Sequence, residues 1–263
     1  MVAPPAPAGP PRIFSPTRRR ARRARARALQ AQGDAARWFF EDMADDVIER
    51  LGFLRHEVRR ALVVGDLAEV VGPALVALGA EVVRADPVAG PGVLRLDEER
   101  PWAESGVAGG FDLLVSVGTL DTVNDLPGAL IHARMALAPG GLFLAAFAGA
   151  GSLPVLRAAM QAADGERPAA RMHPAVDVRA GAQLLQRTGF GYPVADAHTL
   201  SLAYRSVERL LGDLRAQALG SVLADVAPLV ALGAVREAFL AGADADGRVV
   251  ETVEVVTLSG WRK

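Results

Sequence analysis

Acidic and hydroxyl side chains stand at the ends of short apolar runs in the first half of the chain. Asp66 follows ALVVG, Asp86 ends AEVVRAD, and Asp97 ends GVLRLD. A fourth run, FDLLVSVG, contains Ser116 and leads to Asp121. Carboxylates and hydroxyls can accept hydrogen bonds from the hydroxyl and amino groups of a ligand, and a carboxylate can also take up a proton. The chemistry that these residue types suggest is the binding of a small polar ligand.

The apolar runs alternate with helical patterns, which indicates how the acidic residues are positioned. The expected strands are 61–65, 80–87, 92–99, 111–118, 141–149, 198–206 and 247–261. The expected helices are 34–54, 69–79, 125–141, 152–163 and 177–188, with more helix up to about residue 242. Such alternation predicts a mainly parallel sheet with helices on both faces, and the last strand suits an antiparallel addition. Ligands of such sheets bind at the carboxyl ends of the strands, where these acids stand.

Composition excludes several classes of protein. The chain has 263 residues, 51% of them apolar, which is enough for a large core. It contains no cysteine, so thiolate metal sites and a cysteine nucleophile are excluded, and a reducing compartment, the cytoplasm, is expected. The four histidines show no metal-ligand spacing, which argues against a zinc hydrolase, and we expect no metal site. No uncharged apolar stretch is long enough to predict a transmembrane helix.

The N-terminal segment is unusual in composition. Residues 1–11 are rich in proline and alanine and predict a disordered tail. Seven arginines follow between Arg18 and Arg27, with no acidic residue before Asp34. Three interpretations are open: a transit peptide, a basic helix that binds phosphates, or a solvated helix whose arginines face water or an acidic partner. Nucleic acid is disfavoured because no aromatic residue is interleaved with the arginines.

A longer pattern resembles a known family. The order of strand, glycine turn, helix and acid-ended strands leads to FDLLVS and then to VNDLPGALIHARMALAPGGLFLAAF. This pattern is similar to that of class I S-adenosylmethionine-dependent methyltransferases. It is most similar to the branch with the methyltransferase-like assembly factors of respiratory complex I and the biotin-pathway malonyl-carrier methyltransferases. The similarity runs from about Arg12 to the GW pair at 260–261, so it places the arginine segment within the body of the protein.

The resemblance implies a role for each acid. Gly65 would lie at the turn beneath the methionine moiety of S-adenosylmethionine, where the backbone must approach the ligand. Asp86 would bind the ribose hydroxyls, and Asp97 would bind the adenine amino group. The segment from Ser116 to Asp121 would line the cleft beside the sulfonium.

The glycine loop departs from the family pattern, which reads roughly LDxGxGxG where this chain has LVVGDLAE. Val63 replaces an acid that helps to hold the ligand's amino group, and Asp66 is a candidate to replace it. Leu67 and Glu69 replace glycines. A leucine with a positive φ angle would cost on the order of 1–2 kcal/mol, and its side chain would compete with the ligand for space.

Other candidates lie outside this loop. Close relatives carry a His-Trp pair where this chain has Asp121 and Thr122, so Asp121 is the candidate general base. Arg171 and His173 either reach the cleft or lie in a loop. Tyr204 is expected in the core rather than in contact with substrate.

We therefore expect a Rossmann-like α/β methyltransferase sheet with an N-terminal helical cap and a helical insertion before an antiparallel C-terminal strand. The expected divisions are a tail (1–11), basic and amphipathic helices (12–55), a cofactor-binding half (56–150), and an insertion with C-terminal strands that complete the same sheet (151–263).

The leading hypothesis is a methyltransferase that uses S-adenosylmethionine on a small-molecule or protein acceptor. The first alternative is a non-catalytic binding or assembly protein that acts through its arginine helix, with a protein partner at Arg18–Arg27. The second is a hydroxylase of protein side chains, which would need an oxygen-activating cofactor.

Overall fold

A computed structural model describes residues 12–166, 169–225, 228 and 231–263. The expected tail at 1–11 lies outside the described residues. The strands are β1 Arg60–Val64, β2 Glu81–Asp86, β3 Leu94–Arg95, β4 Phe111–Val117, β5 Leu137–Ala148, β6 Gly191–Tyr204 and β7 Val249–Trp261. The α-helices are α1 Pro16–Gln30, α2 Trp38–Leu54, α3 Val71–Ala77, α4 Leu126–Ala136, α5 Pro154–Asp164, α6 Val178–Arg187, α7 Val207–Ala216 and α8 Leu232–Leu240. Two short 3₁₀ helices are η1 Trp102–Ser105 and η2 Leu120–Thr122.

One seven-stranded sheet has the order β3-β2-β1-β4-β5-β7-β6. The strands β1 to β5 are parallel to their neighbours, and β7 runs antiparallel between β5 and β6. The predicted antiparallel C-terminal strand is therefore confirmed, and it lies inside the sheet. This α/β architecture confirms the expected fold class.

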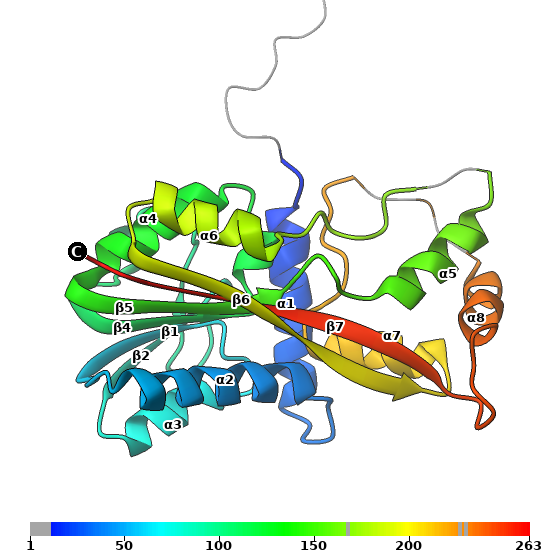
Figure 1. The fold of residues 1–263 in the computed structure, drawn as a ribbon, viewed down its shortest axis with the longest axis horizontal. Helices are drawn as coiled ribbons and strands as arrows, with labels where there is room; N and C mark the ends of the chain where they lie inside the picture. Colours follow the sequence, from blue (N-terminus) through cyan, green and yellow to red (C-terminus); the bar gives the residue numbers. More distant parts are fainter. Residues whose placement is uncertain (1–11, 167–168, 226–227, 229–230) are drawn as a thin grey trace, which may run out of the picture.

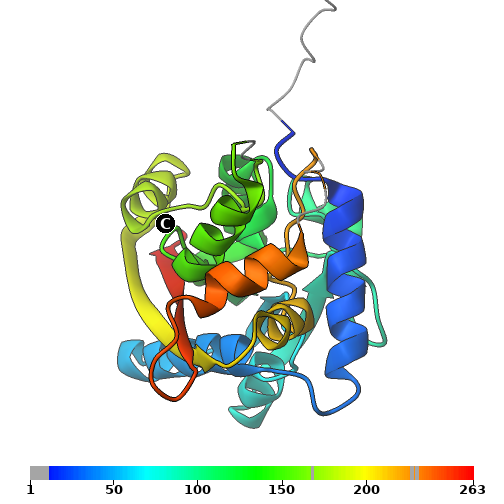
Figure 2. The same ribbon diagram turned by 90° about the vertical axis from the view of Figure 1, so that its right-hand side faces the viewer.

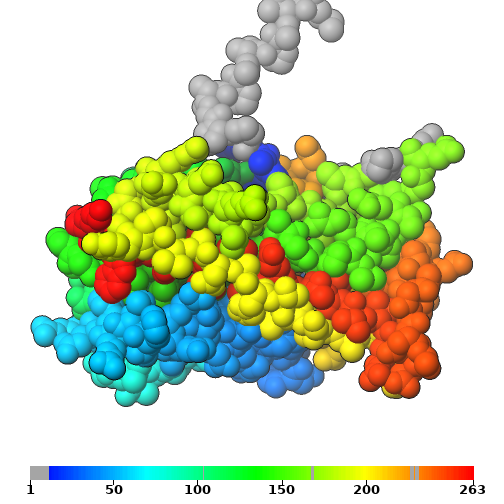
Figure 3. All heavy atoms as spheres, viewed as in Figure 1, coloured from blue at the N-terminus to red at the C-terminus, as the bar shows by residue number. Residues whose placement is uncertain are grey.

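Helices cover both faces of the sheet (Figure 1). Helices α2 and α3 lie on one face, with α5, α7 and α8 contributing to the same core cluster, and α4 and α6 lie on the other face. Because both faces are covered, the central strands are buried along nearly their whole length, which explains their unbroken apolar runs. The edge strand β6 instead crosses the surface between α2 and α6 (Figure 3).

Helix α1 lies across the carboxyl ends of the parallel strands (Figures 1 and 2). The sequence marks the N-terminus of α1 clearly. Ser15 caps the helix by accepting a hydrogen bond from the Arg18 amide, and Pro16 occupies the first turn. Alanine and arginine are good helix formers, so the composition favours a helix here. The position of α1 brings its side chains to the place where the acids of the strand ends meet.

Three strand predictions differ clearly from the structure in their bounds. The strand expected at 141–149 begins at Leu137, because the helix expected at 125–141 ends at Ala136. The strand expected at 92–99 is reduced to β3 Leu94–Arg95, because this edge segment pairs only with β2 over two positions. The strand expected from residue 198 begins at Gly191, because it pairs with β7 from Trp261 onward. Tyr192 and Val194 are exposed on this edge strand, so its first half lacks the apolar pattern of a buried strand.

Candidate functional site

The turn after β1 is shaped by the backbone that faces it. Gly65 has a φ angle of +91°, and a Cβ atom there would lie 2.2 Å from the Val117 carbonyl oxygen and 2.4 Å from Thr119 Cγ2. The protein's own packing of β1 against the end of β4 therefore requires glycine at this position, independently of any ligand.

The rest of this turn is also used by the protein itself. Asp66 accepts hydrogen bonds from the amides of Val70 and Gly72, at 2.9 and 2.8 Å, and so caps the start of α3. Leu67 is buried in the core on the α2 side of the sheet. Glu69, and not Leu67, has the positive φ angle, of 53°. The expected strain thus falls on a different residue from the one predicted.

The Asp86 carboxylate, at the end of β2, is held by partners within the protein on both of its oxygens. Its side chain is 2% exposed, and Arg23 contacts its Oδ2 through Nη2 at 2.6 Å and Nε at 3.1 Å. Its Oδ1 accepts from the Val88 amide at 2.8 Å and lies 3.3 Å from Nη2 of Arg27. Both carboxylate oxygens therefore have partners within the chain.

Arg23 also contacts the ends of β1 and β4. Its Nη2 donates to the Gly65 carbonyl at 3.0 Å and its Nη1 donates to the Gly118 carbonyl at 2.7 Å. One guanidinium from α1 thus occupies the point where the ends of β1, β2 and β4 converge. These are the positions at which the resemblance places the ribose and the methionine moiety of S-adenosylmethionine.

A second arginine of α1 binds the end of β3. Arg19 makes a two-pronged ion pair with Glu98, at 2.9 and 2.8 Å, and also donates to Thr119 and Thr122. Both side chains of the pair are buried. Asp97, which the resemblance implies for the adenine, is exposed and lies 3.8 Å from Arg100. The buried acid at this strand end is therefore Glu98 rather than Asp97.

Ser116 lies beneath these contacts. It is 3% exposed, and its hydroxyl is 2.9 Å from the hydroxyl of Thr119. The structure thus brings Gly65, Asp86 and Ser116 together at the strand ends, as predicted, and leaves Asp97 at the surface.

Sequence reasoning missed the residues that fill this place, Arg19, Arg23 and Glu98. The spacing of Arg19, Arg23 and Arg27 is a signal that could have found the arginines, because residues four apart share one face of a helix. The high arginine content hid this face, because a second face of the helix carries Arg18, Arg22 and Arg25.

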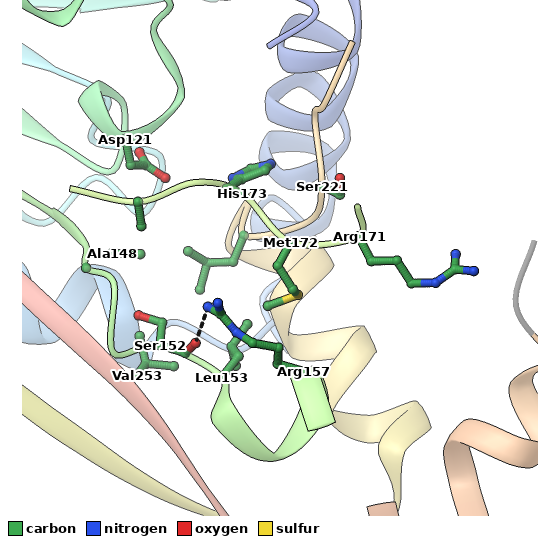
Figure 4. Close-up of a pocket in the computed structure, with 13 residues that line it drawn as sticks. Asp121, Ala148, Ser152, Leu153, Arg157, Arg171, Met172, His173, Ser221 and Val253 are labelled. Carbon is green, nitrogen blue, oxygen red and sulfur yellow. Dashed lines mark hydrogen bonds between the residues drawn. The ribbon is translucent and has the colours of Figure 1, made fainter. Parts of the chain in front are cut away.

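A separate cavity, open to solvent, lies beside the end of β5 (Figure 4). Asp121, Arg171 and His173 all line it, so the structure brings these three predicted candidates together. Arg171 is engaged by Asp164 and by the Pro228 carbonyl. His173 accepts a hydrogen bond from the Val222 amide at 2.7 Å, and burial together with Arg22 and Arg18 lowers its pKa to about 4.

Asp121 is the chemically unusual member of this cavity. Its Oδ1 atom is buried and has no hydrogen-bond partner in the described residues. Burial raises the pKa of its carboxyl, and the positive charge of Arg19 opposes that shift. Tyr204 is buried and donates to Asp213, so its predicted core position is confirmed.

The described residues contain neither a membrane-spanning helix nor a cluster of metal ligands. No helix there is long and apolar enough to span a membrane. No group of three or more histidine, aspartate or glutamate side chains there is arranged to hold a metal ion.

Comparison with known sequences relates the chain to one named protein. Arginine-hydroxylase NDUFAF5, mitochondrial, of Homo sapiens is 31% identical over 182 residues, which are 65% of this chain and 50% of that protein. The protein of that name from Danio rerio is 30% identical over 163 residues, or 58% of this chain and 50% of that protein. The chain thus spans about half the length of the curated relatives it matches. No protein-family model matches the chain.

Comparison with solved structures identifies the fold. A putative methyltransferase of Bacillus halodurans covers 83% of this chain and 99% of its own, with a TM-score of 0.53 and 12% identity. The 1,6-didemethyltoxoflavin-N1-methyltransferase of Burkholderia thailandensis, solved with S-adenosylhomocysteine, covers 98% of this chain and 94% of its own, with a TM-score of 0.51 and 14% identity. The chain has the class I methyltransferase fold. The fold that the resemblance implied is thereby confirmed.

The residues of this methyltransferase fold do not fit S-adenosylmethionine as they are arranged. Asp86 has no free carboxylate oxygen, and Arg23 lies against Gly65 and Gly118 where the cofactor would lie. Separating a buried ion pair of this kind costs about 3–5 kcal/mol, which corresponds to a factor of roughly 150 to 5,000 in affinity.

Proposed function

We propose that the chain is a methyltransferase-fold binding protein in which α1 seals the cofactor region. The observation that carries this proposal is the insertion of Arg23 between Asp86 and the carbonyls of Gly65 and Gly118. A cofactor would have to displace a guanidinium that already satisfies all three groups.

The altered glycine loop supports the same proposal. Leu67 is packed into the core, and both oxygens of Asp66 already accept backbone hydrogen bonds at the start of α3, so neither side chain offers an unused polar group to a ligand. Val63 is fully buried and has no polar atom on its side chain. None of these side chains supplies the acid that the family pattern places in the loop.

The outer arginines of α1 offer a surface for a partner. Burial lowers the pKa of Arg22, and the neighbouring charges of Arg18, of Arg215 on α7 and of Arg25 lower it further. None of the four has a carboxylate within 4.0 Å in the described part of the chain. Guanidinium groups bind carboxylates in a two-pronged geometry, so we propose an acidic protein segment as the partner.

Methyl transfer is the second candidate function. The cavity with Asp121 lies beside the end of β5, next to the region in which the resemblance places the sulfonium, and it suits an acceptor. A neighbour of the same fold was solved with S-adenosylhomocysteine. This function would require α1 to withdraw so that Asp86 is released.

Hydroxylation of a protein side chain is a third candidate, because the sequence relatives are named arginine-hydroxylases. The names of those relatives place them in mitochondria, whereas the cytoplasm stays our prediction for this chain.

Calorimetric titration with S-adenosylhomocysteine separates the first two candidates. The wild-type protein is expected not to bind, and Arg23→Ser is expected to gain binding because it frees Asp86. Arg25→Ser is the matched control on the exposed side of the same helix and is expected to behave like the wild type. Micromolar binding by the wild type would overturn the sealed-site proposal and favour methyl transfer.

A further inference from the structure

The cavity beside β5 is built from apolar walls and a few polar groups. It opens to solvent at the molecular surface. Its apolar lining comprises Ala148, Leu153, Met172, Ala175, Leu219 and Val253. A mostly apolar lining with a few convergent polar groups is typical of sites for small molecules.

One wall of the cavity holds a carboxylate that lacks a partner. Asp121 follows β4, and its Oδ1 atom is buried without a hydrogen bond in the described residues. An unsatisfied buried acceptor is unfavourable, because it has lost its water without gaining a donor. A ligand that donates to Oδ1 would remove this penalty.

Another wall holds a guanidinium that also lacks a carboxylate. Arg157 makes only one long hydrogen bond, of 3.4 Å, to the Ser152 carbonyl, and it has no ion pair in the part of the chain that the structure describes. Figure 4 shows its guanidinium and the carboxylate of Asp121 directed toward the same space from different elements. Arg171 differs, because Asp164 already binds it.

His173 does not add charge to this cavity at neutral pH. Its Nε2 accepts from the Val222 amide, so its proton resides on Nδ1. The cavity therefore presents one carboxyl group and one guanidinium group that have no ion-pair partner among the described residues.

We propose that this cavity binds a small zwitterionic molecule, whose cationic group contacts Asp121 and whose anionic group contacts Arg157. The apolar walls would pack against the carbon chain between the two charges. A simple amine would leave Arg157 unpaired, and a simple carboxylate would leave Asp121 unpaired. The inference goes beyond the proposed function and does not depend on it, because neither residue contacts Asp86 or Arg23.

Calorimetric titration with ω-amino acids of increasing chain length tests the ligand class. The series comprises β-alanine, γ-aminobutyrate and their longer homologues, with L-amino acids and alkyl amines and carboxylates of matched length beside them. At least one zwitterion is expected to bind on the order of tenfold or more tightly than its matched amine and carboxylate. Absence of binding by every zwitterion, or equal binding by a matched amine or carboxylate, would overturn the proposal.

Variants of the two charged residues test the assignment. Asp121→Asn and Arg157→Gln should each reduce binding of that zwitterion on the order of tenfold or more, whereas Arg157→Lys should retain most of it. Arg179→Gln, on α6 and outside the cavity lining, is the control for loss of a positive charge.

Thermal unfolding without ligand gives a second readout. Asp121→Asn should raise the melting temperature at neutral pH, because it replaces a buried, unpaired carboxylate by a neutral amide. Unchanged binding in both Asp121→Asn and Arg157→Gln, or a lower melting temperature for Asp121→Asn, would contradict the assignment.

Discussion

The Arg23 guanidinium contacts the Asp86 carboxylate at 2.6 Å, and both side chains are almost completely buried. This ion pair joins α1 to the end of β2 at the point where a class I methyltransferase fold would hold its cofactor. The pair therefore makes α1 an integral part of the fold, so its loss should lower the stability of the whole protein.

Replacing the acid of this pair should destabilise the protein strongly. Asp86→Asn leaves Arg23 buried without its charge partner, so we expect a loss of about 3–5 kcal/mol in the free energy of unfolding. Asp97→Asn is the matched control: its side chain is exposed and 3.8 Å from Arg100, and we expect a change within about 0.5 kcal/mol. Urea denaturation of both variants measures the difference, and equal stabilities would show that the buried pair contributes nothing.

Gly65 should be required for packing even without a cofactor. Gly65 and Gly79 have nearly the same φ angle, +91° and +90°, but only Gly65 has neighbours where a Cβ atom would stand. Gly79→Ala should cost on the order of 1 kcal/mol from backbone strain, and Gly65→Ala should cost clearly more because the Val117 carbonyl must move. Similar losses in chemical denaturation would refute the packing role.

Leu67 and Glu69 should respond differently to truncation. Leu67→Ala removes a buried core side chain and should cost about 2–5 kcal/mol. Glu69→Gly relieves the strain of a positive φ angle but removes a partly exposed ion pair with Arg84, so these effects offset and the change should stay within about 1 kcal/mol. Thermal and urea unfolding test both variants, and a stable Leu67→Ala protein would mean that Leu67 is not part of the core.

His173 should make the protein less stable in mild acid. Its pKa is about 4 in the folded protein and 6.5 in the reference state, so the unfolded chain binds more protons between these values. The contribution of the neutral imidazole is fully present above pH 6.5 and is lost as the pH falls toward 4, up to about 3 kcal/mol.

The comparison of wild type with His173→Gln isolates this effect from the titration of carboxylates, including Asp121 in the same cavity. The difference in unfolding free energy between the two proteins should change over the stated pH range. An NMR titration that gives His173 a pKa near 6.5 would contradict the account.

Much of the fold could be predicted because central strands buried on both faces leave continuous apolar runs, as in 61–65 and 111–118. The edge strand β6 was predicted too short because its first half is exposed. The strand-end positions of Asp86 and Ser116 followed from the parallel topology.

The side chains that fill the site at the strand ends could not be predicted in the same way. Arginines stand on two faces of α1, one with Arg19, Arg23 and Arg27 and one with Arg18, Arg22 and Arg25, so the sequence does not say which face is turned inward. Glu98 and Asp97 are neighbours at the end of β3, and only the path of the chain decides which one is buried. The strain assigned to Leu67 lies instead at Glu69, because φ angles in an irregular turn depend on its local hydrogen bonds.

Native-state hydrogen exchange of α1, in the presence and absence of excess S-adenosylhomocysteine, tests the sealed cofactor region most directly. Our account predicts that the amides of α1 exchange only by opening that is nearly global, with the same protection in both samples, because Arg19 and Arg23 fix the helix to three strand ends. Low protection of α1, or protection that changes when the ligand is added, would show a movable lid over a working cofactor site and would contradict the account.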